Sequence, residues 1–145
     1  MYDDILLPVA PGSAANDAVP HAQSLAERYD ATVHVVSAVD TLEHTLSGPR
    51  VASLADRVES GAERRVETVT AELDAAGIDV VGHVIHGDPL QVIENAIEDT
   101  GADIVVMPTH TRTGIQRVLL GSVTEKVVRV SSVPVVTVPM TDHET

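Results

Sequence analysis

The chain has 145 residues and no cysteine, which excludes disulfide bridges, thiol nucleophiles and zinc–thiolate centres. Its formal net charge of −13 repels nucleic-acid phosphates and anionic membrane surfaces, so neither is expected as a partner. The length suffices for one domain with a full core, and no apolar run approaches the ~20 residues needed to cross a bilayer. We therefore expect a single domain over residues 1–145.

Lysine is almost absent, since Lys126 is the only one, while Asp, Glu, Val, Ala and Thr are abundant. This balance favours a halophilic protein from a cytosol at high salt, where screening relieves the self-repulsion of an acidic surface. An acidic surface that is merely well solvated is the alternative. The first residues, MYDDILLPV, lack the basic flank and long apolar stretch of a signal peptide, so a cytoplasmic location is expected.

The first half of the chain alternates strand and helix patterns. DILLPV at 4–9 predicts a doubly buried strand. A helix over 17–29 follows, and Pro20 is tolerated only in its first turn. A β-branched strand over 32–39 comes next. The stretch 40–50 has little periodicity and predicts a flexible connection.

The second half continues this alternation. An amphipathic helix over 51–76 precedes a strand over 78–86. Asp88 is the expected N-cap and Pro89 the first residue of a helix that Gly101 stops. The remaining predicted elements are a strand over 103–108, a helix over 122–130 and a strand over 134–139.

Continuous apolar strands that alternate with helices predict an α/β three-layer sandwich, in which helices cover both faces of a parallel sheet. In such a sheet, a ligand binds at the carboxyl ends of the strands, where the winding reverses direction. The loop that begins at Met107 follows a strand in this way.

The stretch MPTHTRTGIQRVLLGSVTEKV, residues 107–127, carries the strongest local signal. Ser122 and Glu125 open a helix as S-x-x-E, which predicts a capping box. A helix start after Gly121 also presents free N–H groups and a positive dipole end to an anion. The phosphate-loop pattern G-x-x-x-x-G-K-[ST] is absent.

The chain resembles the universal stress protein family over nearly its full length. The matching stretches are ILLPV, HVV at 34–36, GDP at 87–89, VVMPTHTRTGIQRVLLGSVTEKV and PVVTVP. The resemblance implies a flavodoxin-like, Rossmann-like five-stranded parallel sheet in the order 3-2-1-4-5, and a homodimer joined through the strand at 134–139. In one branch of the family it also implies a bound ATP; the other branch lacks nucleotide binding.

The sequence departs from the ATP-binding branch at three positions. That branch carries G-x-x-G-x(9)-G-[ST], and here Gly121 and Ser122 match its end, while Pro108 and Thr111 replace the first two glycines. Ala10 stands where the family has an aspartate that contacts the nucleoside. Proline removes an N–H group, and threonine adds bulk where a phosphate approaches closely. We therefore expect weakened or absent ATP binding, with Mg²⁺ only together with ATP.

The candidate nucleotide or phosphate site combines two strand ends, one residue of the second strand, and the loop with the helix that follows it: Pro8, Val9, Ala10, Val35, Met107, Pro108, His110, Thr111, Gly121, Ser122, Val123 and Thr124. His83 and His86 lie on opposite faces of a predicted strand, which argues against joint metal ligation. The sequence contains no pattern of residues that indicates a catalytic site.

Three functions stay open at this point. The first is a stress-response regulatory protein with a residual site for a small nucleotide or anion. The second is an ATP-binding protein with weak hydrolase or nucleotide-sensing activity. The third is a dimeric scaffold that binds a partner.

Overall fold

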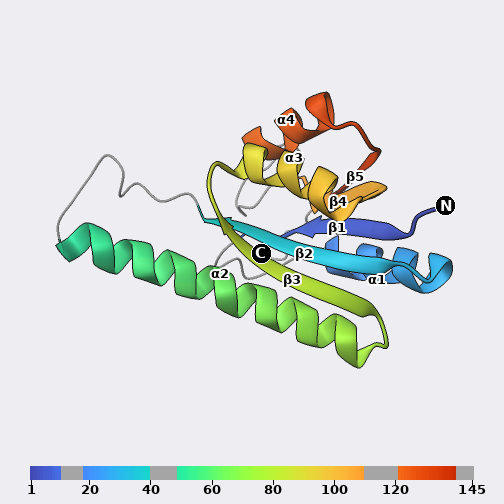
Figure 1. Cartoon of the computed structure of the whole chain (residues 1–145), viewed down its shortest axis with the longest axis horizontal. Helices are drawn as coiled ribbons and strands as arrows, with labels where there is room; N and C mark the ends of the chain where they lie inside the picture. Colours follow the sequence, from blue (N-terminus) through green and yellow to red (C-terminus); the bar gives the residue numbers. More distant parts are fainter. Residues whose placement is uncertain (11–17, 40–48, 110–120, 140–145) are drawn as a thin grey trace.

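The computed structural model describes residues 1–10, 18–39, 49–109 and 121–139. Strands and helices alternate along these residues, as predicted (Figure 1). In chain order they are β1 (Asp4–Pro8), α1 (Ala18–Tyr29), β2 (Thr32–Val39), α2 (Pro49–Ala75), β3 (Asp79–His86), α3 (Pro89–Thr100), β4 (Ile104–Pro108), α4 (Ser122–Val130) and β5 (Val135–Val138).

The five strands form one parallel sheet in the order β3-β2-β1-β4-β5. This confirms the predicted fold class and strand order. Because β1 is central and the chain winds first toward β3 and then toward β5, the direction of winding reverses between β1 and β4. The carboxyl ends of these two strands therefore mark the place where a ligand is expected.

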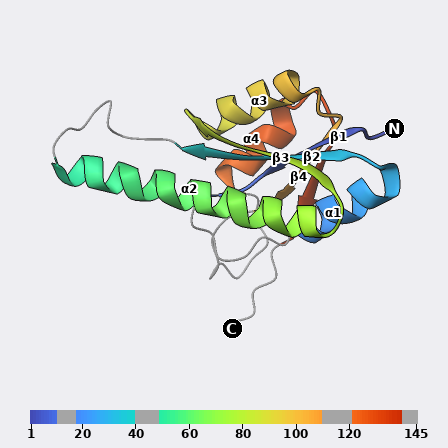
Figure 2. The same ribbon diagram turned by 60° about the horizontal axis from the view of Figure 1, so that its bottom comes forward.

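The sheet separates two hydrophobic cores, because successive strand residues point to opposite faces. Ile5 and Leu7 of β1 face one core, together with buried residues of α1 and α2. Leu6 faces the other core, together with α3 and α4. The buried residues of both cores are aliphatic apart from Met107, and Tyr2 packs against the first core. The two layers of helices are seen on either side of the sheet in Figure 1, and Figure 2 shows α2 running along its face.

The ends of the elements match the predictions closely. α3 begins after Asp88, whose Oδ2 accepts a hydrogen bond from the Gln91 amide at 3.2 Å, and it ends at Gly101, which adopts a left-handed φ of 71°. Helix α2 begins at Pro49, two residues before the predicted 51. The predicted start of the first helix at residue 17 and most of the predicted connection at 40–50 lie outside the described residues.

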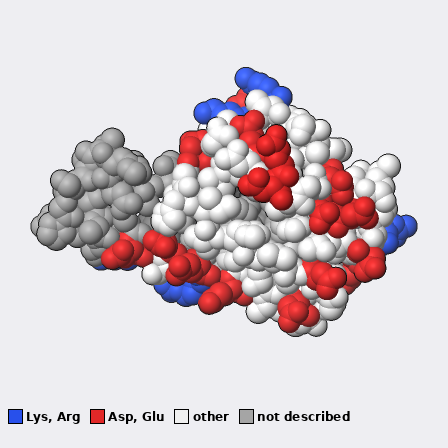
Figure 3. Space-filling model, viewed as in Figure 1, with Lys and Arg blue, Asp and Glu red and all other residues white. Residues whose placement is uncertain are grey.

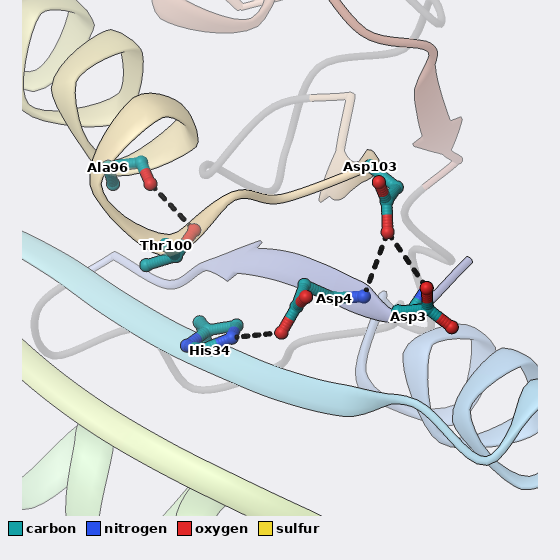
Figure 4. Close-up of polar contacts among 6 residues, drawn as sticks. All are labelled: Asp3, Asp4, His34, Ala96, Thr100 and Asp103. Carbon is teal, nitrogen blue, oxygen red and sulfur yellow. Dashed lines mark hydrogen bonds and ion pairs between the residues drawn. The ribbon is translucent and has the colours of Figure 1, made fainter. Parts of the chain in front are cut away.

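Polar contacts hold the amino ends of the strands together (Figure 4). The Asp103 carboxylate, just before β4, accepts hydrogen bonds from the amides of Asp3 and Asp4 at 2.8 and 3.1 Å. The Asp4 carboxylate contacts Nε2 of His34 on β2 at 2.9 Å. These contacts join β4, β1 and β2 at their amino ends, which lie at the end of the sheet opposite the expected ligand site.

Among the described residues, no helix is long and apolar enough to cross a membrane.

Candidate functional site

A cavity of about 220 Å³ lies at the carboxyl ends of the central strands, between the starts of α3 and α4. It is therefore at the point where the winding of the sheet reverses. Its lining comes from β1, β2, β4, α3 and α4: Pro8, Val9, Ala10, Val36, Ala38, Pro89, Val92, Ile93, Met107, Pro108, Val123 and Thr124.

The lining of this cavity is apolar. None of its described lining residues carries a charge, and its one hydroxyl, on Thr124, donates to the Pro108 carbonyl at 3.0 Å. Pro8, Pro89 and Pro108 have no backbone N–H to offer a ligand. A cavity of about 150 Å³ can hold a benzene-sized ring, so the volume here is sufficient for a ring system, and the apolar lining favours an apolar ring over a charged group.

The start of α3 is closed to an anion. Gly87, with φ of 148°, turns the chain from β3 into the helix. The carboxylate of Asp88 then accepts the Gln91 amide, and Pro89 occupies the first helical position. A fixed negative charge therefore stands where the helix dipole would favour an external anion.

The start of α4 is different. Gly121 is its N-cap, with an extended conformation and no side-chain capping bond. The Glu125 amide bonds the Gly121 carbonyl at 2.9 Å. No acceptor for the amides of Ser122, Val123 and Thr124 is seen within the described residues. This end of the cavity is where an anion would find hydrogen-bond donors.

The predicted capping box of Ser122 and Glu125 is wrong. Ser122 is the first residue of α4 rather than its N-cap, because Gly121 takes the extended cap conformation one residue earlier. From inside the first turn the Ser122 hydroxyl is misplaced for capping. The Glu125 carboxylate instead pairs with Arg129, one turn further along, at 3.2 Å.

The structure brings most of the predicted site residues together. Seven of them line the cavity: Pro8, Val9, Ala10, Met107, Pro108, Val123 and Thr124. Gly121 and Ser122 form the adjoining start of α4. His110 and Thr111 lie outside the described residues. That these residues contact a nucleotide stays a prediction.

Val35 does not join this group. It is fully buried in the core between the sheet and helices α1 and α2, on the face away from the cavity. Its neighbour Val36 pairs with Pro8 in the sheet and lines the cavity instead. A shift of one residue along a strand changes the face, which is why the prediction missed Val36 and Ala38.

The prediction also missed Pro89, Val92 and Ile93 of α3. The GDP motif placed Pro89 at the first position of a helix, and a sheet that reverses its winding brings that helix start near the site. Together these two signals point to Pro89. Within the described residues, no group of three or more His, Asp or Glu side chains is placed to share a metal ion.

Comparison with known proteins places these features in a family. Residues 1–139 match the model of the universal stress protein family. Universal stress protein MJ0577 of Methanocaldococcus jannaschii is 35% identical over 85 residues, which span 59% of this chain and 52% of that relative. In sequence, the match thus covers about half the length of that relative.

Solved structures give the same result over the full length. The structure of MJ0577 superposes with a TM-score of 0.80 and 27% identity, covering 98% of this chain and 99% of that one. A universal stress protein solved in complex with cAMP gives a TM-score of 0.69 at 22% identity, over 94% and 97% of the two chains. A family protein from Arabidopsis thaliana with AMP bound gives 0.67 at 15% identity, over 99% and 95%.

Proposed function

Because this chain belongs to the universal stress protein family, we propose that it is a stress-response regulatory protein in which ATP binding is weakened or lost. In this proposal an anion site remains at the start of α4. The observation that carries it is the apolar, proline-lined cavity at the carboxyl ends of β1 and β4, with Ala10 and Pro108 in its lining.

The loss of hydrogen bonds supports weakened binding. Ala10 offers no carboxylate to a ribose, and Pro108 offers no N–H to a phosphate. The third changed position, Thr111, lies outside the described residues. Each lost hydrogen bond costs roughly 0.5–1.5 kcal/mol, so three losses weaken affinity by about two decades.

The residual anion site rests on the start of α4. Three consecutive amides there meet no acceptor in the described part of the chain, and no carboxylate caps the helix. We expect a phosphate or sulfate to bind the amides near Gly121, Ser122, Val123 and Thr124. Arg112 and Arg117 precede this helix in the sequence.

A nucleotide-binding function is the second candidate. Two structural neighbours hold cAMP or AMP, and the cavity is large enough for a ring system. In this alternative the protein senses a nucleotide or hydrolyses ATP weakly, with Mg²⁺ arriving together with ATP.

The third candidate, a dimeric scaffold for a partner, is favoured by the apolar edge strand β5, whose residues carry no charge.

Calorimetric titration of ATP decides between the first two candidates. The variant with Ala10→Asp, Pro108→Gly and Thr111→Gly should bind ATP one to two orders of magnitude more tightly than the wild type, on the rough energies above. Both proteins are measured at the same salt and Mg²⁺ concentration. Ala75→Asp, at an exposed position on α2, adds the same charge elsewhere and should leave ATP binding unchanged.

Tight binding by the wild type would support the nucleotide-binding candidate and contradict the proposal. If the triple variant gains nothing, the missing groups are not what weakens binding. Mass spectrometry of gently purified wild type adds a direct check, because a co-purified nucleotide would count against a lost site.

A further inference from the structure

β3 is a long outer strand of the sheet. In the described part of the chain no strand pairs with its outer edge, and six of its eight residues are exposed. Val81 and Ile85 are 43% and 38% exposed, although both are large and apolar. Free backbone groups along such an edge can pair with another strand.

The two faces beside this edge differ in chemistry. Val80 and Val84 pack against the core under α2, and a Cβ on Gly82 would meet side chains of α2. Strand alternation therefore puts Val81 and Ile85 on the opposite face, where α3 packs over β1 and β2. An added strand would find apolar neighbours on that face.

The face on the α2 side is bordered by acids. His86 contacts Glu59 at 3.4 Å, and Gly82 lies against Val66 and Thr70, so α2 runs antiparallel to β3. Four exposed acidic residues lie on the same side of α2 as Glu59, because they follow helical spacing from it. Together with Glu59 they form an acidic stripe that borders the strand: Asp56, Glu63, Glu67 and Asp74. Arg57 and Arg64 lie further round the helix, away from β3. In Figure 3 an uncharged band crosses the middle of the molecule, with acidic residues above and below it.

The dimensions of stripe and strand agree. From Asp56 to Asp74 the helix rises about 27 Å, and eight strand residues extend about 26 Å. Neighbouring acids four residues apart on α2 are separated by about 6 Å. Alternate side chains of a strand are about 6.6 Å apart, so three alternate residues of an added strand would meet Glu59, Glu63 and Glu67.

We propose that the outer edge of β3 binds an extended, cationic peptide segment of a partner protein, in which apolar and basic residues alternate. The segment adds a sixth strand to the sheet, with its apolar side chains beside Val81 and Ile85 and its basic side chains beside Glu63 and Glu67. A second copy of this chain is disfavoured, because it would bring two acidic stripes together. This inference is independent of the nucleotide site.

The test is a titration of ¹⁵N-labelled full-length protein with an octapeptide in which lysine and valine alternate. A peptide of the same composition, with four lysines followed by four valines, is the control. Both are measured at the lowest KCl concentration at which circular dichroism shows the protein folded. We expect amide shifts along β3 and the facing side of α2, and at least about tenfold tighter binding of the alternating peptide.

Variants of the protein separate edge pairing from general attraction to an acidic surface. Glu63→Gln with Glu67→Gln should weaken the alternating peptide about three- to tenfold, since two exposed ion pairs are lost. Glu27→Gln with Glu72→Gln removes the same charge from exposed positions away from β3, and should change binding less than twofold. All four positions are at the surface, so the fold should be kept.

Equal binding of the two peptides, or equal weakening by the two double variants, would overturn the proposal. Amide shifts elsewhere on the surface would do so as well. If the β3 amides shift when the protein is concentrated without peptide, a second copy occupies the edge and the proposed partner is wrong.

Discussion

The two edges of the sheet differ in length, cover and charge. β5 has only four residues, three of them half-buried, and none is charged. β3 has eight residues, six of them exposed, and an acidic stripe on α2 borders it. A short apolar edge suits a copy of itself, because pairing brings no like charges together. A long edge beside acids suits a partner of opposite charge. One sheet can thus offer two kinds of interface.

The largest expected effect is on self-association through β5. We propose that the protein is a homodimer joined through Val135–Val138, as the family resemblance implies. Val136→Lys would put a lysine from each copy into the paired edges, and should raise the dissociation constant at least about 100-fold. Because Val136 also packs against the core formed with α1 and α2, the melting temperature of the variant is measured beside its sedimentation. Sedimentation at tens of micromolar protein and high salt measures this.

The control is the same change on the other edge. Ile85→Lys on β3 should leave the dimer intact. A wild type that sediments as a monomer under these conditions would contradict the dimer. If instead Ile85→Lys dissociates it while Val136→Lys does not, the two edges have been assigned the wrong way round.

The second prediction concerns the acidic surface beside β3. If salt screening makes the net charge of −13 tolerable, the melting temperature should rise by about 5–10 °C between low and molar KCl, or roughly 2–3 kcal/mol for a chain of this size. The Glu63→Gln, Glu67→Gln variant should show a smaller rise, because it carries less of the repulsion. Equal melting temperatures of the wild type at both salt levels would leave the acidic surface without this explanation.

The third prediction tests how closely α2 packs on β3. A Cβ on Gly82 would lie 2.6 Å from Cγ1 of Val66 and 2.9 Å from Cγ2 of Thr70, so these side chains, the helix or the strand must shift. Gly82→Ala should lower the free energy of unfolding by about 1–3 kcal/mol, as overpacking usually does. Urea denaturation measures the change, and His83→Ala at the neighbouring exposed position is the control. A Gly82→Ala variant as stable as the wild type would show that α2 has room to move.

Much of the fold could be predicted because each element has local signals that agree with its neighbours. Asp88, Pro89 and Gly101 fix both ends of α3, and the apolar run at 104–108 has the composition of a doubly buried strand. The strand order follows only from the family resemblance, because five similar apolar runs do not indicate which strands pair with each other.

The site could be predicted less completely. The sequence points to residues next to a strand end or helix start, but it favours Val35 where Val36 lines the cavity. Both are buried valines, and nothing local tells which face of a doubly covered strand meets a ligand. The sequence also predicts Ser122 as the N-cap of α4, one residue after the observed N-cap, Gly121. Either residue can precede a helix, and the backbone conformation decides between them.

The smallest expected effect distinguishes the two faces of β3 itself. Val80 packs against the core under α2, whereas Val81 is 43% exposed on the opposite face. Val→Thr keeps the shape but replaces one methyl group with a hydroxyl. Val80 is half-buried against the core, so a hydroxyl there loses part of its water on folding, and Val80→Thr should cost about 1–2 kcal/mol of unfolding free energy. Val81→Thr should change it by less than about 0.5 kcal/mol, since water still reaches the side chain. Urea denaturation of both variants measures the difference. Equal costs would mean that the face carrying Val81 is covered in solution, and the peptide proposed for β3 would then have to displace whatever covers it.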